Sequence, residues 1–156
     1  KVLPDCAIST DIIVGFPGET EEEFEETLQI MNEVVFDRAF MFKYSSRSGT
    51  KAAEYSDQIS EKNKQNRLER LIDLQHSHTL KANQRHIGTI LKVLIEKESK
   101  KSNLQWMGRT EGNMGVIFNK SDEQIKDIVD ILIMDAQGVS LFGNRVLKKE
   151  LIHEVN

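Results

Sequence analysis

An apolar run that breaks into a turn and then an acidic helix start constrains this chain more than any other feature. Residues 7–14 are rich in isoleucine and valine, which is typical of a buried strand in a parallel sheet. Residues 15–18 (Gly-Phe-Pro-Gly) form the turn, and Thr20 with Glu23 completes a capping box that begins a helix. Residues 36–44 indicate a second strand. The segment therefore predicts a right-handed strand–helix–strand unit, and ligands of such folds bind beyond the carboxyl ends of the strands.

A second, longer helix is predicted from Ser60 to about Gln84. Its predicted inner stripe consists of Leu68, Leu71, Ile72 and Gln75. Its basic residues are Lys62, Lys64, Arg67, Arg70 and Lys81. The length of this helix and its place between two unlike regions indicate a bridge between them.

After Gly88 the apolar residues recur with a period of two, which indicates strands. Five short strands with glycine-containing turns predict a small antiparallel barrel. They are expected at residues 90–98, 104–110, 115–118, 128–134 and 139–146. The chain is thus predicted to be α+β, with a partial α/β unit, a linking helix, a barrel and a tail. The expected boundaries are 1–59, 60–86, 87–150 and 151–156.

Charge is distributed unevenly along the 156 residues, whose net charge is −4. Residues 61–120 carry 12 basic and 6 acidic side chains, whereas the segments before and after them are net acidic. A basic middle suits an anionic partner such as RNA, because lysine and arginine displace counterions from phosphates. A solvated basic helix face explains the same pattern and stays open as the alternative.

Cysteine and histidine usage argues against a metal site built by this chain. The single cysteine, Cys6, excludes an internal disulfide and an all-cysteine metal site, and it is expected to be a small buried apolar residue. His76 and His78 are two positions apart on the predicted helix and therefore point to different faces. No apolar run reaches the length of a membrane helix and no signal peptide begins the chain, so a cytoplasmic location is expected.

Several motifs, in order along nearly the whole chain, carry a family resemblance. Residues 10–24, Thr-Asp-Ile-Ile-Val-Gly-Phe-Pro-Gly-Glu-Thr-Glu-Glu-Glu-Phe, and residues 40–53 resemble the late part of the radical-SAM domain of methylthiotransferases of the MiaB type. Residues 108–113 (Gly-Arg-Thr-Glu-Gly-Asn) and 141–143 (Leu-Phe-Gly) resemble the TRAM domain of the same family. The chain departs from the family at Ser46 and Ser48, where the pattern has prolines, so this loop is expected to be less rigid.

The resemblance implies a remnant of the radical-SAM barrel, joined by the long helix to a TRAM domain, which is an OB-like RNA-binding barrel. Such enzymes use S-adenosylmethionine and two [4Fe-4S] clusters held by cysteine thiolates. Because Cys6 matches no cluster motif, the resemblance implies a C-terminal fragment of an enzyme. This fragment is expected to be inactive and to hold no cofactor, and its truncated sheet edge is expected to favour pairing with a neighbour.

Site residues follow from the same resemblance. Ile13, Val14, Phe16 and Tyr44 are expected to border the S-adenosylmethionine pocket, with plain core packing as the alternative for Ile13 and Val14. Arg47 is expected to grip a phosphate or the cofactor carboxylate, or else to be a solvated loop residue.

The barrel supplies the expected RNA contacts: Lys100, Lys101, Trp106, Arg109, Asn113 and Phe142. Aromatic faces stack on unpaired bases, and arginine stacks or holds phosphate. Arg109 and Asn113 match the family motif position by position. Trp106 as a barrel-core residue and Lys100 with Lys101 as a solvated pair are the alternatives.

The expected parent enzyme methylthiolates an isopentenyl-adenosine next to the anticodon, with the anticodon stem-loop of tRNA as partner. The TRAM barrel and the basic helix are expected to hold that stem-loop. Sister enzymes that act on threonylcarbamoyl-adenosine or on an aspartate of a ribosomal protein are the alternatives. A stand-alone, non-enzymatic RNA-binding module is the alternative from another class. The oligomeric state is left open.

Overall fold

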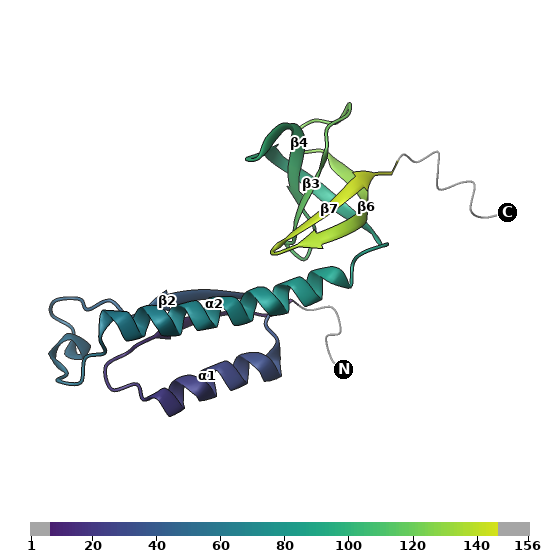
Figure 1. Cartoon of the computed structure of the whole chain (residues 1–156). Coiled ribbons are helices and arrows are strands. Elements are labelled where there is room, and N and C mark those ends of the chain that lie inside the picture. Colours follow the sequence, from purple (N-terminus) through teal and green to yellow (C-terminus); the bar gives the residue numbers. More distant parts are fainter. Residues whose placement is uncertain (1–6, 147–156) are drawn as a thin grey trace. The chain divides into compact units, whose positions relative to one another are not determined.

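The computed structural model describes residues 7–146, which form two compact units that divide between Thr79 and Leu80 (Figure 1). Cys6, the tail at 151–156 and the last positions of the expected barrel, 147–150, lie outside the described residues. Within the described residues no helix is long and apolar enough to cross a membrane. The α+β class predicted from the sequence is confirmed.

The first unit is the predicted strand–helix–strand arrangement followed by a helix. Its elements are β1 (Ser9–Val14), α1 (Glu21–Val34), β2 (Arg38–Lys43), a short 3-10 helix (Lys51–Glu54) and α2 (Glu61–Gln84), which runs across the division. β1 and β2 pair in parallel. The capping box is present, because the Glu23 backbone N–H donates to the Thr20 hydroxyl at 3.2 Å and the Thr20 N–H donates to the Glu23 carboxylate at 2.8 Å.

Helices α1 and α2 lie side by side and cover one face of the two strands (Figure 1). Val14, Phe24, Met31 and Leu71 are fully buried between them and form the core of this unit. Alternation along the strands leaves the opposite face uncovered within the described residues, so Ile13, Phe40 and Phe42 are each more than half exposed.

An ion-pair network joins α2 to the start of α1. The buried Arg67 donates to Glu19 at 2.5 Å and to Glu21 at 3.2 Å. Arg70 donates to Glu21 at 2.6 Å and also to Glu25. The hydrogen bond from Arg70 is the largest of the effects that hold the pKa of the Glu21 carboxyl below its ordinary value of 4.5.

This network reduces the basic surface of α2, whose contact with RNA stays a prediction. Lys64 and Arg67 are buried rather than solvated, and Lys64 pairs with Glu61 at 3.0 Å. With Arg70 also paired, three of the five basic residues are neutralised by carboxylates of the same unit. The charge pattern of the sequence could not reveal this, because the carboxylates that pair with Arg67 and Arg70 lie 45 to 49 positions away.

The second unit is the predicted five-stranded barrel, closed in the order β3-β4-β5-β7-β6. Its strands are β3 (Ile90–Ser99), β4 (Ser102–Arg109), β5 (Gly115–Asn119), β6 (Ile128–Gln137) and β7 (Ser140–Arg145). Four pairings are antiparallel, but β5 and β7 run parallel, with Gly115 opposite Ser140 and Phe118 opposite Gly143. The expectation of a wholly antiparallel barrel is corrected at this pairing, because a closed ring with an odd number of strands cannot alternate direction throughout.

Two glycines allow strands of the barrel to pack closely. A Cβ atom on Gly108 would lie 2.5 Å from the Leu94 carbonyl oxygen and from the Val93 side chain. A Cβ atom on Gly143 would meet the Leu132 carbonyl oxygen in the same way. Both glycines are therefore required by packing inside the barrel.

We expect Gly108→Ala to lower the free energy of unfolding of the barrel by about 1–3 kcal/mol, because the added methyl group meets backbone that cannot move aside. Urea unfolding followed by the fluorescence of Trp106, the single tryptophan, measures this. Gly112→Ala is the control, because its Cβ would come no closer than 3.7 Å to another atom. Equal stability of the two variants would contradict the packing role of Gly108.

We expect Arg67→Met to lower the free energy of unfolding of the helical unit by about 3 kcal/mol, because it leaves the largely buried Glu19 carboxylate without its cationic partner. Lys62→Met on the exposed face of α2 is the matched control and should change stability by less than about 0.5 kcal/mol. Urea unfolding followed by circular dichroism at 222 nm compares them. A difference below about 1 kcal/mol would show that the network adds little to stability.

Candidate nucleic-acid interface

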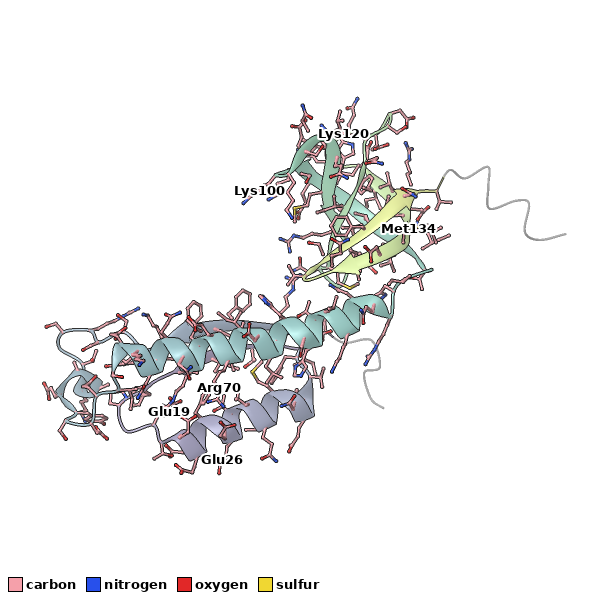
Figure 2. The ribbon with its side chains drawn as sticks, in the orientation of Figure 1. Glu19, Glu26, Arg70, Lys100, Lys120 and Met134 are labelled. Carbon is pink, nitrogen blue, oxygen red and sulfur yellow. The ribbon has the colours of Figure 1, made fainter. Side chains whose placement is uncertain are left out.

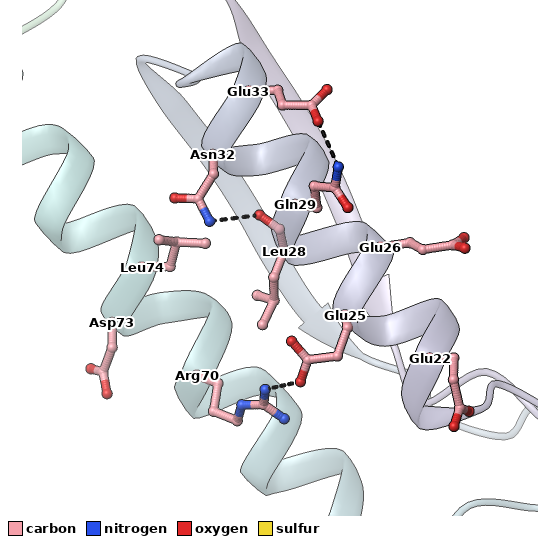
Figure 3. A pocket seen from close by; sticks show the side chains of 10 residues that line it. All are labelled: Glu22, Glu25, Glu26, Leu28, Gln29, Asn32, Glu33, Arg70, Asp73 and Leu74. Carbon is pink, nitrogen blue, oxygen red and sulfur yellow. Dashed lines mark hydrogen bonds and ion pairs between the residues drawn. The ribbon is translucent and has the colours of Figure 1, made fainter.

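The groove between α1 and α2 is acidic (Figure 3). It has a volume of about 900 Å³, and Arg70 is the one cation among its lining residues. Five carboxylates line it: Glu22, Glu25, Glu26, Glu33 and Asp73. Arg70 is already held by Glu21 and Glu25, so the groove presents a negative surface that repels phosphate.

The carboxyl ends of β1 and β2 bring together two of the expected cofactor-pocket residues. The rings of Phe16 and Tyr44 meet edge to face with centroids 5.2 Å apart, and the Lys64 ammonium lies 5.2 Å from the Tyr44 ring centroid. The Tyr44 hydroxyl is buried and has no hydrogen-bond partner among the described residues. Ile13 is 58% exposed, whereas Val14 is fully buried in the core.

Arg47 lies in the loop that follows β2, and its residue is exposed. Its carbonyl oxygen accepts hydrogen bonds from the Thr50 hydroxyl at 2.8 Å and from the Thr50 N–H at 3.2 Å. These bonds fix the turn around Gly49, while the guanidinium makes no hydrogen bond to a described residue.

The structure brings Arg109 and Asn113 into direct contact at the turn between β4 and β5. The guanidinium of Arg109 donates to the Asn113 side-chain oxygen at 2.7 Å and to Glu96 at 3.1 Å. Asn113 has a positive φ of 62°, which turns the chain back toward Arg109. Both residues line a cavity of about 440 Å³ whose apolar lining residues are Leu94 and Ile128.

The turn between β3 and β4 carries two free cations of the barrel. Lys100 and Lys101 are exposed and make no ion pair with any described residue. Lys120, by contrast, pairs with Glu98 and lies 4.2 Å from the ring centroid of Trp106. Figure 2 shows Lys100 and Lys120 on the barrel, and Glu19, Glu26 and Arg70 on the helical unit.

Trp106 is half-buried and packs against the barrel core. Its indole nitrogen is buried without a hydrogen-bond partner among the described residues. Because Lys120 lies over its ring, part of the aromatic face of Trp106 is already covered.

Phe142 lines a separate cavity of about 200 Å³ on the outside of the barrel. The residues around it include three amides that sequence reasoning missed: Gln105, Asn119 and Asn144. The alternation of residues along β4, β5 and β7 could have placed them together, but only once the order of the strands was known.

Among residues 7–146, no three histidine, cysteine, aspartate or glutamate side chains gather to hold a metal ion. On the helical unit, the described residues form an acidic groove and a separate aromatic contact between Phe16 and Tyr44. On the barrel they offer free lysines, an arginine–asparagine pair and an amide-lined aromatic cavity.

Comparison with known proteins agrees with this arrangement. Residues 84–146 match the TRAM domain family. The chain is 45% identical over 147 residues to a tRNA-2-methylthio-N(6)-dimethylallyladenosine synthase of Christiangramia forsetii and 47% identical to that of Porphyromonas gingivalis, in each case over 94% of the chain. It is 40% identical over its whole length to the synthase of Methylacidiphilum infernorum.

The chain covers 31%, 32% and 35% of these three relatives, so it spans about a third of their length. Over the third that it spans, the chain is similar to these synthases, and the match to the TRAM domain family falls on its barrel.

Proposed function

We propose that this chain is the RNA-binding part of a tRNA methylthiotransferase and that its barrel holds the anticodon stem-loop. The observation that carries the proposal is a TRAM domain match over a closed five-stranded barrel whose turn lysines, within the described residues, are free of carboxylate partners. The full-length protein would attach a methylthio group to an adenosine, as the names of the relatives state for them.

The distribution of charge favours the barrel over the helices as the RNA surface. An exposed lysine without a carboxylate partner can neutralise a phosphate and release its counterion. Lys100 and Lys101 meet that condition among the described residues, and so do Lys62 and Lys81 on α2, whereas Arg67 and Arg70 are held by carboxylates. The acidic groove between α1 and α2 adds repulsion on the helical side.

The residues of this chain fit S-adenosylmethionine but do not fit an iron–sulfur cluster. Iron–sulfur clusters need several thiolates, and the chain has one cysteine, so no step here involves a cluster. S-adenosylmethionine would supply the methyl group of the reaction. Ile13, Phe16 and Tyr44 offer it apolar and aromatic surface at the carboxyl ends of β1 and β2, and the unpartnered Tyr44 hydroxyl offers a hydrogen bond. The chain by itself is proposed to be catalytically inactive.

We expect the 156-residue chain to bind an anticodon stem-loop with an affinity that falls as salt rises. The Lys100→Gln, Lys101→Gln double variant should make the plot of log K against log salt less steep by about 0.7–0.9 for each phosphate that is no longer neutralised. Fluorescence anisotropy with a labelled stem-loop measures both quantities. Lys62→Gln on α2 is the control with a similarly exposed lysine. An unchanged slope in the double variant would exclude this turn as a phosphate-binding site.

We expect Arg109→Ala to weaken stem-loop binding by about 1–3 kcal/mol in low salt, because it removes the one cation of the Arg109–Asn113 pair. Arg85→Ala is the control, since Arg85 is exposed and makes no ion pair with a described residue. The same anisotropy titration compares them, and Trp106 fluorescence verifies that the barrel is folded. Equal affinity of wild type and Arg109→Ala would remove Arg109 from the interface.

A further inference from the structure

We infer that the outer face of β4, β5 and β7 is a binding site for one unpaired nucleobase, which stacks on Phe142 while side-chain amides hydrogen-bond its edge. We call this surface the amide platform; it consists of Gln105, Ile117, Asn119, Met134, Phe142 and Asn144. The inference rests on the proposed RNA-binding function and names the part of the RNA that this surface recognises.

The barrel itself puts these side chains on one surface. Val116, Phe118 and Leu141 are fully or almost fully buried, so the residues that alternate with them point outward. The strand register then places Gln105 opposite Asn119 on β4 and β5, and Ile117 opposite Phe142 on β5 and β7. Residues from these three strands, with Met134 from β6, thus meet around one cavity.

The chemistry of the platform matches a base rather than a phosphate. Its lining residues carry no charge, and its volume of about 200 Å³ is below that of sites for drug-sized ligands, which suits a single planar ring. The half-buried Phe142 supplies an aromatic face, and stacking on such faces accepts any base. Each amide offers both a donor and an acceptor, the combination that base edges require.

The amides are partly ordered before a ligand arrives. The Gln105 amide donates to the Asn119 side-chain oxygen at 3.3 Å, which orients both groups. The side chain of Asn144 is exposed and makes no hydrogen bond to a described residue, so it is available to a ligand. Asp135, the cross-strand neighbour of Phe142, accepts hydrogen bonds from the Ala136 N–H and the Gln137 amide.

Lysines flank the platform residues in the sequence, but none of them lines the cavity. The turn with Lys100 and Lys101 leads directly into β4, and Gln105 lies three residues into that strand. Asn119 ends β5 and is followed by Lys120. A single RNA strand can therefore set its phosphates along Lys100 and Lys101, which make no ion pair with a described residue, while one base turns onto Phe142. The cavity at Arg109 is less suited to a base, because Glu96 and Glu111 line it.

The test separates base contacts from phosphate contacts by their salt dependence. In stem-loop titrations by fluorescence anisotropy, we expect Phe142→Leu and Asn144→Ala to weaken binding, Phe142→Leu by roughly tenfold, with no change in the salt slope. Phe142→Tyr keeps the stacking ring and should bind like wild type. Val139→Ala and Asn103→Ala, at exposed positions outside the platform, are the controls.

A blunt-ended, fully paired RNA duplex of the same charge provides a second comparison. Its bases are not available, so Phe142→Leu and wild type should bind it equally. Equal loss of stem-loop and duplex binding in Phe142→Leu, or wild-type stem-loop affinity in both Phe142→Leu and Asn144→Ala, would overturn the platform and leave the proposed RNA-binding function standing. Absence of any RNA binding by the wild-type chain would instead overturn the proposed function, and the platform with it.

Discussion

The parallel pairing of β5 with β7 is the constraint on which the rest of this structure depends. Five strands can close into a ring only if one neighbouring pair runs in the same direction, and this pair closes it. Closure gives each barrel strand a neighbour on both sides and so leaves no open edge among the described strands of the barrel. The interior is filled by packed side chains and by the close approach at Gly108 and Gly143. A ligand must therefore bind to the outside of the ring, where alternate residues of each strand point.

Cationic side chains have different roles in the two units. In the helical unit, Arg67 and Arg70 hold α1 and α2 together through Glu19, Glu21 and Glu25, so the cations serve packing. The groove between the helices is left acidic. In the barrel, free lysines lie in a turn, and the surface around Phe142 is neutral. An anionic polymer with planar bases matches this combination of separate cations and uncharged, amide-lined aromatic surface.

The sequence predicted those features that local chemistry determines. The capping box of Thr20 and Glu23, the parallel strands around α1 and the five barrel strands all follow from short-range patterns and are present. It did not predict the features that depend on contacts between distant residues. The burial of Lys64 and Arg67 is one such feature, because the carboxylates that pair with Arg67 come from a different helix and turn. The amide platform was missed for the same reason, since Gln105, Asn119 and Asn144 meet only when the strands close. The contact between Arg109 and Asn113 spans four residues, but it needs the positive φ of Asn113.

We have proposed that RNA binds the outer face of the barrel and not the helical unit. Mapping of backbone amide NMR shifts in a ¹⁵N-labelled chain, titrated with an anticodon stem-loop, tests it most directly. We expect the shifted resonances to belong to the β3–β4 turn and to β4, β5 and β7, while those of α1 stay in place. Shifts concentrated along the acidic groove between α1 and α2, with the barrel unaffected, would contradict it.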